Sequence, residues 1–125
     1  MVSSRQEFDP LEFLNLAEVL AQRRTISEAE ARTAISRSYY AVHLYCRGRL
    51  TTTRRMNATG TGGDHLLVVQ ILRSLGGSDG DQVDSLRRQR TRADYNMTQR
   101  ISSNDAAMAV ALARALFQSL PARGI

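Results

Sequence analysis

Four arginines fall within six positions of one segment, and an Asp-Tyr pair follows them directly. These residues are Arg87, Arg88, Arg90, Arg92, Asp94 and Tyr95. A guanidinium group is a planar fork of donors that pairs with phosphate, and a neighbouring phenol could donate to a phosphoryl group or be modified by one. The segment therefore predicts a phosphate-binding site. The plainer alternative is a structural ion pair between Arg90 and Asp94, with the other arginines in solvent.

The other residue types with reactive side chains are few. His43 and His65 lie on different predicted helices, and neither has an acidic residue three or four positions later. The pattern therefore favours neither a metal site nor a general-base pair, and no cofactor is predicted. Cys46 lies among apolar residues at helical spacing, where a thiol behaves as a small hydrophobic side chain, so we expect it in the core.

Two further segments could contact a phosphate or a base. The glycine-rich stretch 60–63 is similar to a phosphate-cradling turn, but it follows no strand and lacks the Lys-Ser/Thr pair of a P-loop, so it is interpreted as a loop. Tyr39 and Tyr40 are neighbours, and a helix turns neighbours about 100° apart. One ring should face the core and the other a boundary or a partner, with stacking on nucleic-acid bases as the alternative.

Five helices are expected to position these residues. They span approximately residues 10–23, 28–50, 64–75, 81–93 and 102–120. Asp9 before a proline marks the first start, Ser27 with Glu30 forms a capping box at the second, and Asp64 and Asp81 are expected to cap the third and fourth. Pro121 is expected to end the last helix.

The apolar spacing of these helices predicts how they pack. In 28–50, one stripe that includes Ile35, Tyr39 and Cys46 should face the core, while a second stripe that includes His43 is polar. Arg90 shares its stripe with apolar residues of the fourth helix, so it is the arginine expected to point inward. The predicted fold is all-α, an antiparallel up-and-down bundle of four to five helices forming a single domain, 1–125, with its core in about 10–120.

Composition narrows the function further. The net charge is +5 and all 17 basic residues are arginine, which indicates an acidic or phosphorylated partner. No apolar run approaches the ~18 residues of a membrane span, and the N-terminus lacks the apolar core of a secretory signal. The single cysteine cannot form an internal disulfide. We therefore expect a cytoplasmic protein that does not bind membranes.

Two segments resemble a known family. Ala34-Ile35-Ser36-Arg37-Ser38-Tyr39-Tyr40-Ala41 and Arg90-Thr91-Arg92-Ala93-Asp94-Tyr95 are similar to motifs of the HEPN superfamily, in its small single-domain branch. The resemblance covers about residues 10–120. It implies an all-α up-and-down bundle that forms a homodimer and is often encoded beside a minimal nucleotidyltransferase in toxin–antitoxin or defence systems. Many members are metal-independent endoribonucleases.

The resemblance also implies roles for particular residues. In the family, an arginine and a histidine four to six residues apart meet the same pair from a second protomer. The arginine position falls on Arg90 and the histidine position on Tyr95, so the candidate catalytic residues are these two with Asp94. Tyrosine is a poor base at neutral pH because a phenol has a pKa of about 10. The two positions are also about 140° apart on a continuous helix, so they converge only if the helix ends or bends near Ala93.

Three functional hypotheses follow. In the first, a homodimer binds RNA and cleaves it, with phosphates held by three further arginines: Arg87, Arg88 and Arg92. In the second, a non-catalytic module binds a nucleotidyltransferase or a nucleotide, and Tyr95 is a modification site. In the third, the protein is a helical scaffold without chemistry, and its arginines serve solubility and ion pairs.

Overall fold

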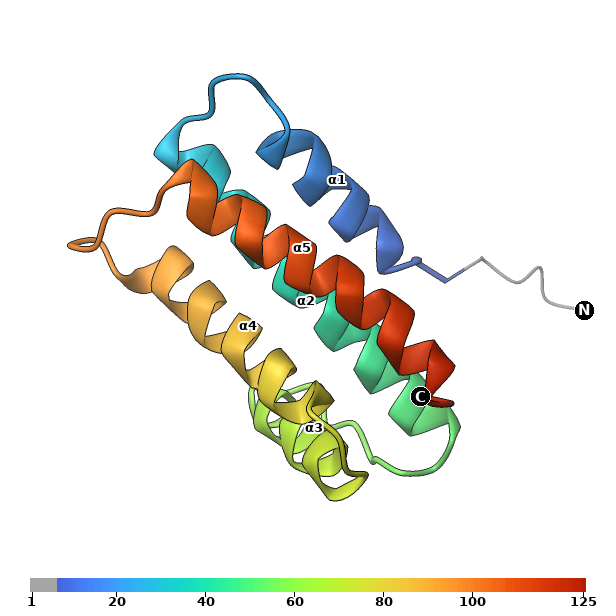
Figure 1. Ribbon diagram of the computed structural model, residues 1–125. Coiled ribbons are helices and arrows are strands. Elements are labelled where there is room, and N and C mark those ends of the chain that lie inside the picture. Colours follow the sequence, from blue (N-terminus) through green and yellow to red (C-terminus); the bar gives the residue numbers. More distant parts are fainter. Residues whose placement is uncertain (1–6) are drawn as a thin grey trace, which may run out of the picture.

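The helices form an antiparallel bundle built around α2. The computed structural model describes residues 7–125. Its helices are α1 (Leu11–Ala21), α2 (Glu28–Thr52), α3 (Gly63–Ser74), α4 (Asp79–Tyr95) and α5 (Ser103–Ala122). Figure 1 shows α1, α2, α4 and α5 running alternately in opposite directions, with α3 beside the first half of α4. Residues 7–125 contain no strand, which confirms the predicted all-α bundle.

Residues 1–6 lie outside the described part of the chain. These six residues belong to the predicted domain range 1–125. They also belong to the N-terminal segment in which no secretory signal was expected. Within residues 7–125, no helix has the length and apolarity that crossing a bilayer requires.

Serine caps fix the beginnings of the two longest helices. Ser27 accepts a hydrogen bond from the backbone of Glu30, and the Glu30 carboxylate accepts one from the backbone of Ser27. This confirms the predicted capping box. Ser102 and Asp105 form the same reciprocal pair at the start of α5, so that helix begins at Ser103, within the predicted range.

The starts predicted for α3 and α4 were wrong. Asp64 lies inside the first turn of α3, and its carboxylate accepts from the backbone of Thr59 and Gly60 in the preceding loop. It therefore ties that loop to the helix. Asp81 is also inside its helix, because α4 begins two residues earlier at Asp79, whose side chain pairs with Arg123.

The predicted end of α5 was wrong by two residues. Pro121 lies in the last turn of the helix, which continues to Ala122. A proline there cannot donate its own hydrogen bond. The backbone nitrogen of Arg123 still bonds to the carbonyl of Ser119, so the turn closes around the proline.

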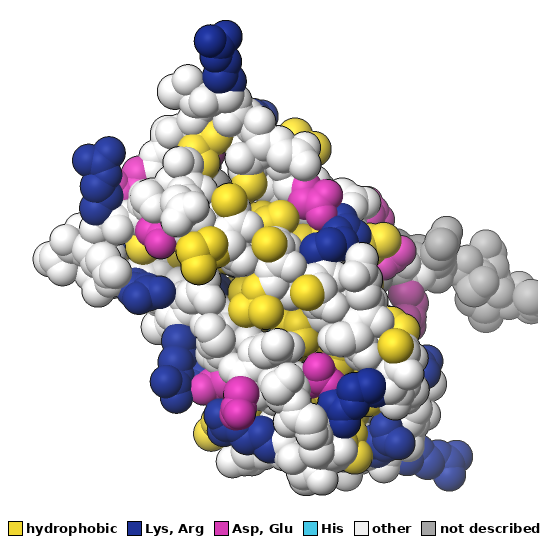
Figure 2. All heavy atoms as spheres, viewed as in Figure 1, with side chains coloured by type: hydrophobic (Ala, Val, Ile, Leu, Met, Phe, Trp, Pro, Cys, Tyr) yellow, Lys and Arg dark blue, Asp and Glu magenta, His cyan; other side chains and the backbone are white. Residues whose placement is uncertain are grey.

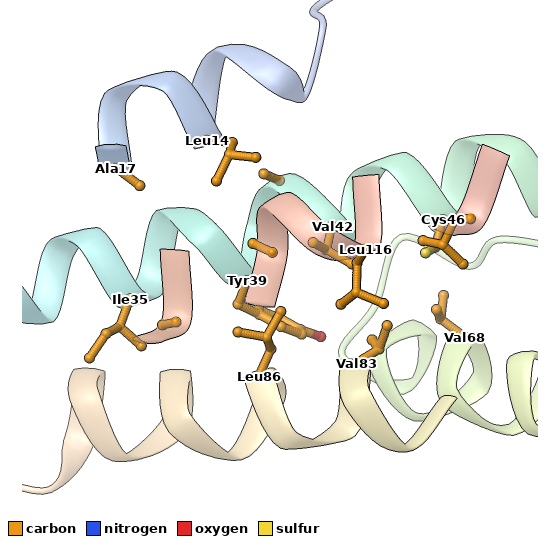
Figure 3. Packing of buried hydrophobic residues seen from close by; sticks show 14 of the residues in the cluster. Leu14, Ala17, Ile35, Tyr39, Val42, Cys46, Val68, Val83, Leu86 and Leu116 are labelled. Atoms are coloured by element: carbon orange, nitrogen blue, oxygen red, sulfur yellow. The ribbon is translucent and has the colours of Figure 1, made fainter. Parts of the chain in front are cut away.

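The core is formed by α2 and the helices around it. Tyr39 is fully buried between α2 and α4 and lies near Leu86 in Figure 3. Cys46 is also fully buried, and burial raises the pKa of its thiol to about 12, as expected for a packing residue. One residue of the α2 stripe that was predicted to be polar is instead buried: His43 is only 2% exposed. The His43 ring stacks on His65 of α3, which covers it.

Figure 2 shows one side of the bundle. Apolar side chains gather in a band along the middle of this face, over α5 in Figure 1, and charged side chains lie mostly around it. Neither histidine is visible on this face. The residues singled out above as reactive lie on α2, α3 and α4.

Candidate functional site

Arg90 crosses from α4 to the aromatic side chains of α2. Its side chain is 14% exposed, and its guanidinium donates a hydrogen bond to the Tyr40 hydroxyl. The guanidinium carbon lies 5.0 Å from the centre of the Tyr40 ring and 5.8 Å from that of Tyr39. These contacts confirm the prediction that Arg90 points inward. A cation over aromatic faces is held in place without being neutralised.

Asp94 supplies the nearest negative charge to Arg90. Its Oδ2 lies 3.2 Å from the Arg90 Nε, which confirms the ion pair predicted from their spacing. The Nε–H nevertheless makes no hydrogen bond, because its direction does not suit the carboxylate. Burial acts to lower the pKa of Arg90, but the bond to Tyr40 and the nearby Asp94 raise it, so the group stays charged. Arg90 thus keeps its positive charge, while its unpaired Nε–H is buried.

Two histidines lie beside this arginine. The rings of His43 and His65 stack with their centres 4.1 Å apart and 15° between their planes. Burial, the neighbouring ring and Arg47 lower the pKa of His43 to about 4. Burial together with Arg90 lowers the pKa of His65 as well. Both rings are therefore neutral at pH 7, and Arg90 remains the cation of the site.

A hydrogen bond from Tyr39 sets the tautomer of His65. The Tyr39 hydroxyl bonds to Nδ1 of His65, and burial raises the pKa of the phenol, so the phenol keeps its proton. Among residues 7–125 that hydroxyl has no other acceptor, so its O–H donates to Nδ1. A neutral imidazole then carries its proton on Nε2. His65 consequently carries an N–H donor on Nε2. We name Tyr39, Tyr40, His43, His65 and Arg90 the arginine–aromatic cluster.

The remaining candidate, Tyr95, lies at the end of α4. The helix continues to Tyr95 without the break expected near Ala93. The guanidinium of Arg90 still comes within 5.7 Å of the Tyr95 ring centre, because its side chain is long enough to span the angle. Tyr95 is 68% exposed, so its phenol is open to solvent next to the cluster.

Of the other arginines of α4, Arg87 lies near enough to the cluster to lower the pKa of His65, while Arg88 and Arg92 line a different surface. Arg87 and Arg88 both pair with the buried carboxylate of Asp84, at 2.7 and 3.0 Å, and Arg73 of α3 joins them at 3.5 Å. These ion pairs engage much of their charge within the fold. Arg92 is exposed and lines the same surface hollow as Arg88, between α4 and α5. The predicted four-arginine patch is therefore divided between two sides of α4.

Arg32 of α2 holds the end of α4 in place. Its guanidinium donates to the backbone carbonyls of Ala93 at 2.8 Å and Gln99 at 2.7 Å. It also donates to the carbonyl of Arg92 at 3.4 Å and pairs with the carboxylate of Glu28, 2.8 Å away. Cations satisfy the free carbonyls at helix C-termini. Arg32 therefore fixes the segment that carries Asp94 and the residues after it.

The two histidines are the site residues that sequence reasoning missed. They are 22 positions apart, and their contact depends on how α3 packs against α2. One signal was available, since His43 follows Tyr39 by four positions and so shares its helical face. Within residues 7–125, no group of three or more His, Cys, Asp or Glu side chains could hold a metal ion.

Comparisons with known proteins add no further assignment. No protein-family model, no curated protein and no solved structure matches the chain. The functional argument therefore starts from the geometry of the cluster.

Proposed function

We propose that the protein binds RNA, with the arginine–aromatic cluster holding a backbone phosphate. The observation that carries this proposal is the state of Arg90, a charged and mostly buried guanidinium held by Tyr40 and Asp94. His65 of the same cluster is neutral and carries an N–H, and Tyr40, which accepts from Arg90, keeps its own O–H to donate. A set of donors around one cation suits an anion with several acceptor oxygens.

RNA is favoured over a small anion by the surroundings of the cluster. The exposed Tyr95 ring lies directly beside Arg90, and Met97, a few positions later, is 71% exposed. Flat and apolar side chains next to a phosphate-binding cation support stacking of unpaired bases. The net charge of +5 would add a favourable long-range field. The resemblance to the HEPN superfamily points to the same ligand.

The resemblance extends this proposal to a homodimer that cleaves the bound RNA without a metal ion, as a toxin in a toxin–antitoxin or defence system. In that form, Arg90 stabilises negative charge on the phosphate and Tyr95 lies near the scissile bond. Expression of the wild type beside Arg90→Ala and Tyr95→Phe tests it. Growth arrest with RNA fragmentation by the wild type alone supports cleavage, and equal, harmless behaviour of all three proteins contradicts it.

Binding itself is tested by fluorescence anisotropy with a labelled single-stranded RNA. Arg90→Ala should weaken binding by about tenfold or more, the value of a lost hydrogen bond to a charged group. Arg24→Ala is the matched control, because it removes the same charge from an exposed position away from the cluster. Equal affinities of the two variants would contradict the proposed site, provided that circular dichroism shows both to be folded.

A second function is favoured by the exposed phenol of Tyr95 beside Arg90. In this version the protein is a non-catalytic module that binds a nucleotidyltransferase. The phenol oxygen would attack the α-phosphorus of a nucleoside triphosphate, pyrophosphate would leave, and the phenolic proton would pass to a base of the partner enzyme. Co-purification with such an enzyme and a nucleotide mass increase that Tyr95→Phe abolishes would establish it.

A further inference from the structure

A groove between α2 and α4 adjoins the arginine–aromatic cluster. Its volume is about 450 Å³, and we name it the α2–α4 groove. It is lined by Ala29, Arg32, Thr33, Ser36, Arg37, Ala93, Asp94 and Met97. A volume of this order is within the range of small-ligand sites, about 300–1,000 Å³. The groove shares Asp94 with the ion pair of Arg90, so a strand held at the cluster can continue into it.

Arg37 gives the groove a second cation. Its guanidinium carbon lies 4.7 Å from the Phe13 ring centre and 5.1 Å from the Tyr40 ring centre. Arg90 lies 5.0 Å from the same Tyr40 ring, so two guanidinium groups flank one aromatic side chain. Within residues 7–125, no carboxylate forms an ion pair with Arg37. Asp94 pairs with Arg90 alone, so the positive charge of Arg37 is not balanced by an ion pair in this part of the chain.

Asp94 gives the groove a free acceptor. Its Oδ2 receives the Ser36 hydroxyl at 3.3 Å and lies against Arg90. Its Oδ1 has no hydrogen-bond partner in the described part of the chain, and 28% of the side chain is exposed. An ionised carboxylate only accepts hydrogen bonds. A ligand that enters the groove must therefore present a donor to Asp94 and an anion to Arg37.

We propose that the α2–α4 groove binds one ribonucleotide of the RNA strand, with Arg37 on its phosphate and Asp94 on its 2′-hydroxyl. This inference rests on the proposed RNA binding and adds the chemistry by which RNA is selected. The 2′-hydroxyl is the sugar donor that DNA lacks. Like charges keep the phosphate away from Asp94, so the two side chains orient the nucleotide in one direction.

Affinities of the wild type for RNA, DNA and 2′-O-methyl RNA of one sequence provide the test. The wild type should prefer RNA to both analogues by about tenfold, because each analogue leaves the carboxylate without its donor. Asp94→Ala should bring the ratio of RNA to DNA affinity close to one. Asp81→Ala is the matched control, since it removes an exposed carboxylate from the same helix, outside the α2–α4 groove.

Arg37 is tested by the salt dependence of binding. Arg37→Ala should weaken RNA and DNA to the same extent and reduce the log–log salt slope by about 0.7, the value for one phosphate contact on a single strand. The discrimination between RNA and DNA should remain. An unchanged slope would overturn the assignment of Arg37.

The outcomes separate this inference from the proposed function. Equal binding of RNA, DNA and the 2′-O-methyl analogue by the wild type would overturn the ribose-reading groove and leave nucleic-acid binding intact. Binding of none of the three would overturn both. The comparison of ligands on the wild type requires no variant to fold, so it decides the matter even where Asp94→Ala is unstable.

Discussion

The protonation state of the stacked histidines decides which ligand the cluster can bind. Neutral His43 and His65 rings pack face to face at 4.1 Å, an arrangement that two positive charges would oppose. Neutrality also lets His65 accept from Tyr39 on one nitrogen and donate from the other. The stacked pair therefore forms an uncharged support next to Tyr39, and His65 carries its N–H on the nitrogen that does not face Tyr39.

Because His43 is neutral in the folded protein, we predict that folding stability depends on pH. Burial lowers the pKa of His43 from 6.5 to about 4, so between these values the unfolded chain binds a proton that the folded chain does not. The stability that neutral His43 contributes is complete above pH 6.5 and is lost as the pH falls toward 4, by about 1.4 kcal/mol per unit. Urea unfolding measured from pH 7.5 to 5 should show this decline.

His43→Phe keeps an aromatic ring against His65 and removes the titrating group. The variant should lose less stability on acidification than the wild type, with a remainder that comes from His65, whose pKa is also lowered. The carboxylates with lowered pKa values, such as Asp64 and Asp84, release their contributions only nearer pH 4. Parallel pH profiles for the wild type and the variant would contradict the assignment to His43.

At the residue scale, sequence reasoning succeeded where the neighbours in space are neighbours along one helix. The inward direction of Arg90 and its pairing with Asp94 follow from helical spacing alone. The contacts of Arg90 with Tyr40 and of Tyr39 with His65 join different helices. No periodicity within one segment specifies such contacts, because they depend on the packing of α2 against α3 and α4.

At the scale of the elements, a glycine allows α3 and α4 to approach closely. A Cβ built on Gly80 would lie 2.8 Å from the backbone nitrogen of Arg73, closer than real Cβ atoms come. This contact brings α3 against the first turn of α4. It therefore helps place His65 of α3 beside Arg90 of α4.

Gly80→Ala should lower the free energy of unfolding by about 1–3 kcal/mol, because the backbone of α3 must move to admit the methyl group. Gly48→Ala is the matched control, since nothing lies within 4 Å of a Cβ there and the residue is helical. That change should stabilise the protein by about 0.4–1 kcal/mol. Chemical denaturation measures both, and an equal effect of the two substitutions would contradict the close approach of α3.

Local signals predicted the existence of every helix but not every boundary. The Ser27 capping box was recognised because both of its members are visible in four consecutive residues. Asp64 and Asp81 were misassigned as caps because an aspartate near a helix start also fits other roles. The carboxylate of Asp64 bonds to the loop before it, and Asp81 pairs with Arg73 of the neighbouring helix. Those partners are set by the chain path between the helices.

At the scale of the whole molecule, some arginines are engaged in ion pairs and others are available to a ligand. Asp84 engages Arg73, Arg87 and Arg88 on one side of α4. On the side toward α2, Arg90 pairs with Asp94, and no ion pair is formed by Arg37 within residues 7–125. The sequence predicted an excess of positive charge, but which arginines remain available for a ligand depends on where the acidic side chains fold. That distribution directs the RNA proposal to the α2 side.

The central claim is that the arginine–aromatic cluster holds a phosphate of RNA, and nuclear magnetic resonance tests it most directly. The ring resonances of His65 and the guanidinium resonances of Arg90 are followed while a short single-stranded RNA is added to the isotope-labelled protein. We predict that both sets shift together and saturate with the binding curve, because the phosphate accepts from both groups. Saturation of binding while the His65 and Arg90 resonances stay in place would contradict the account.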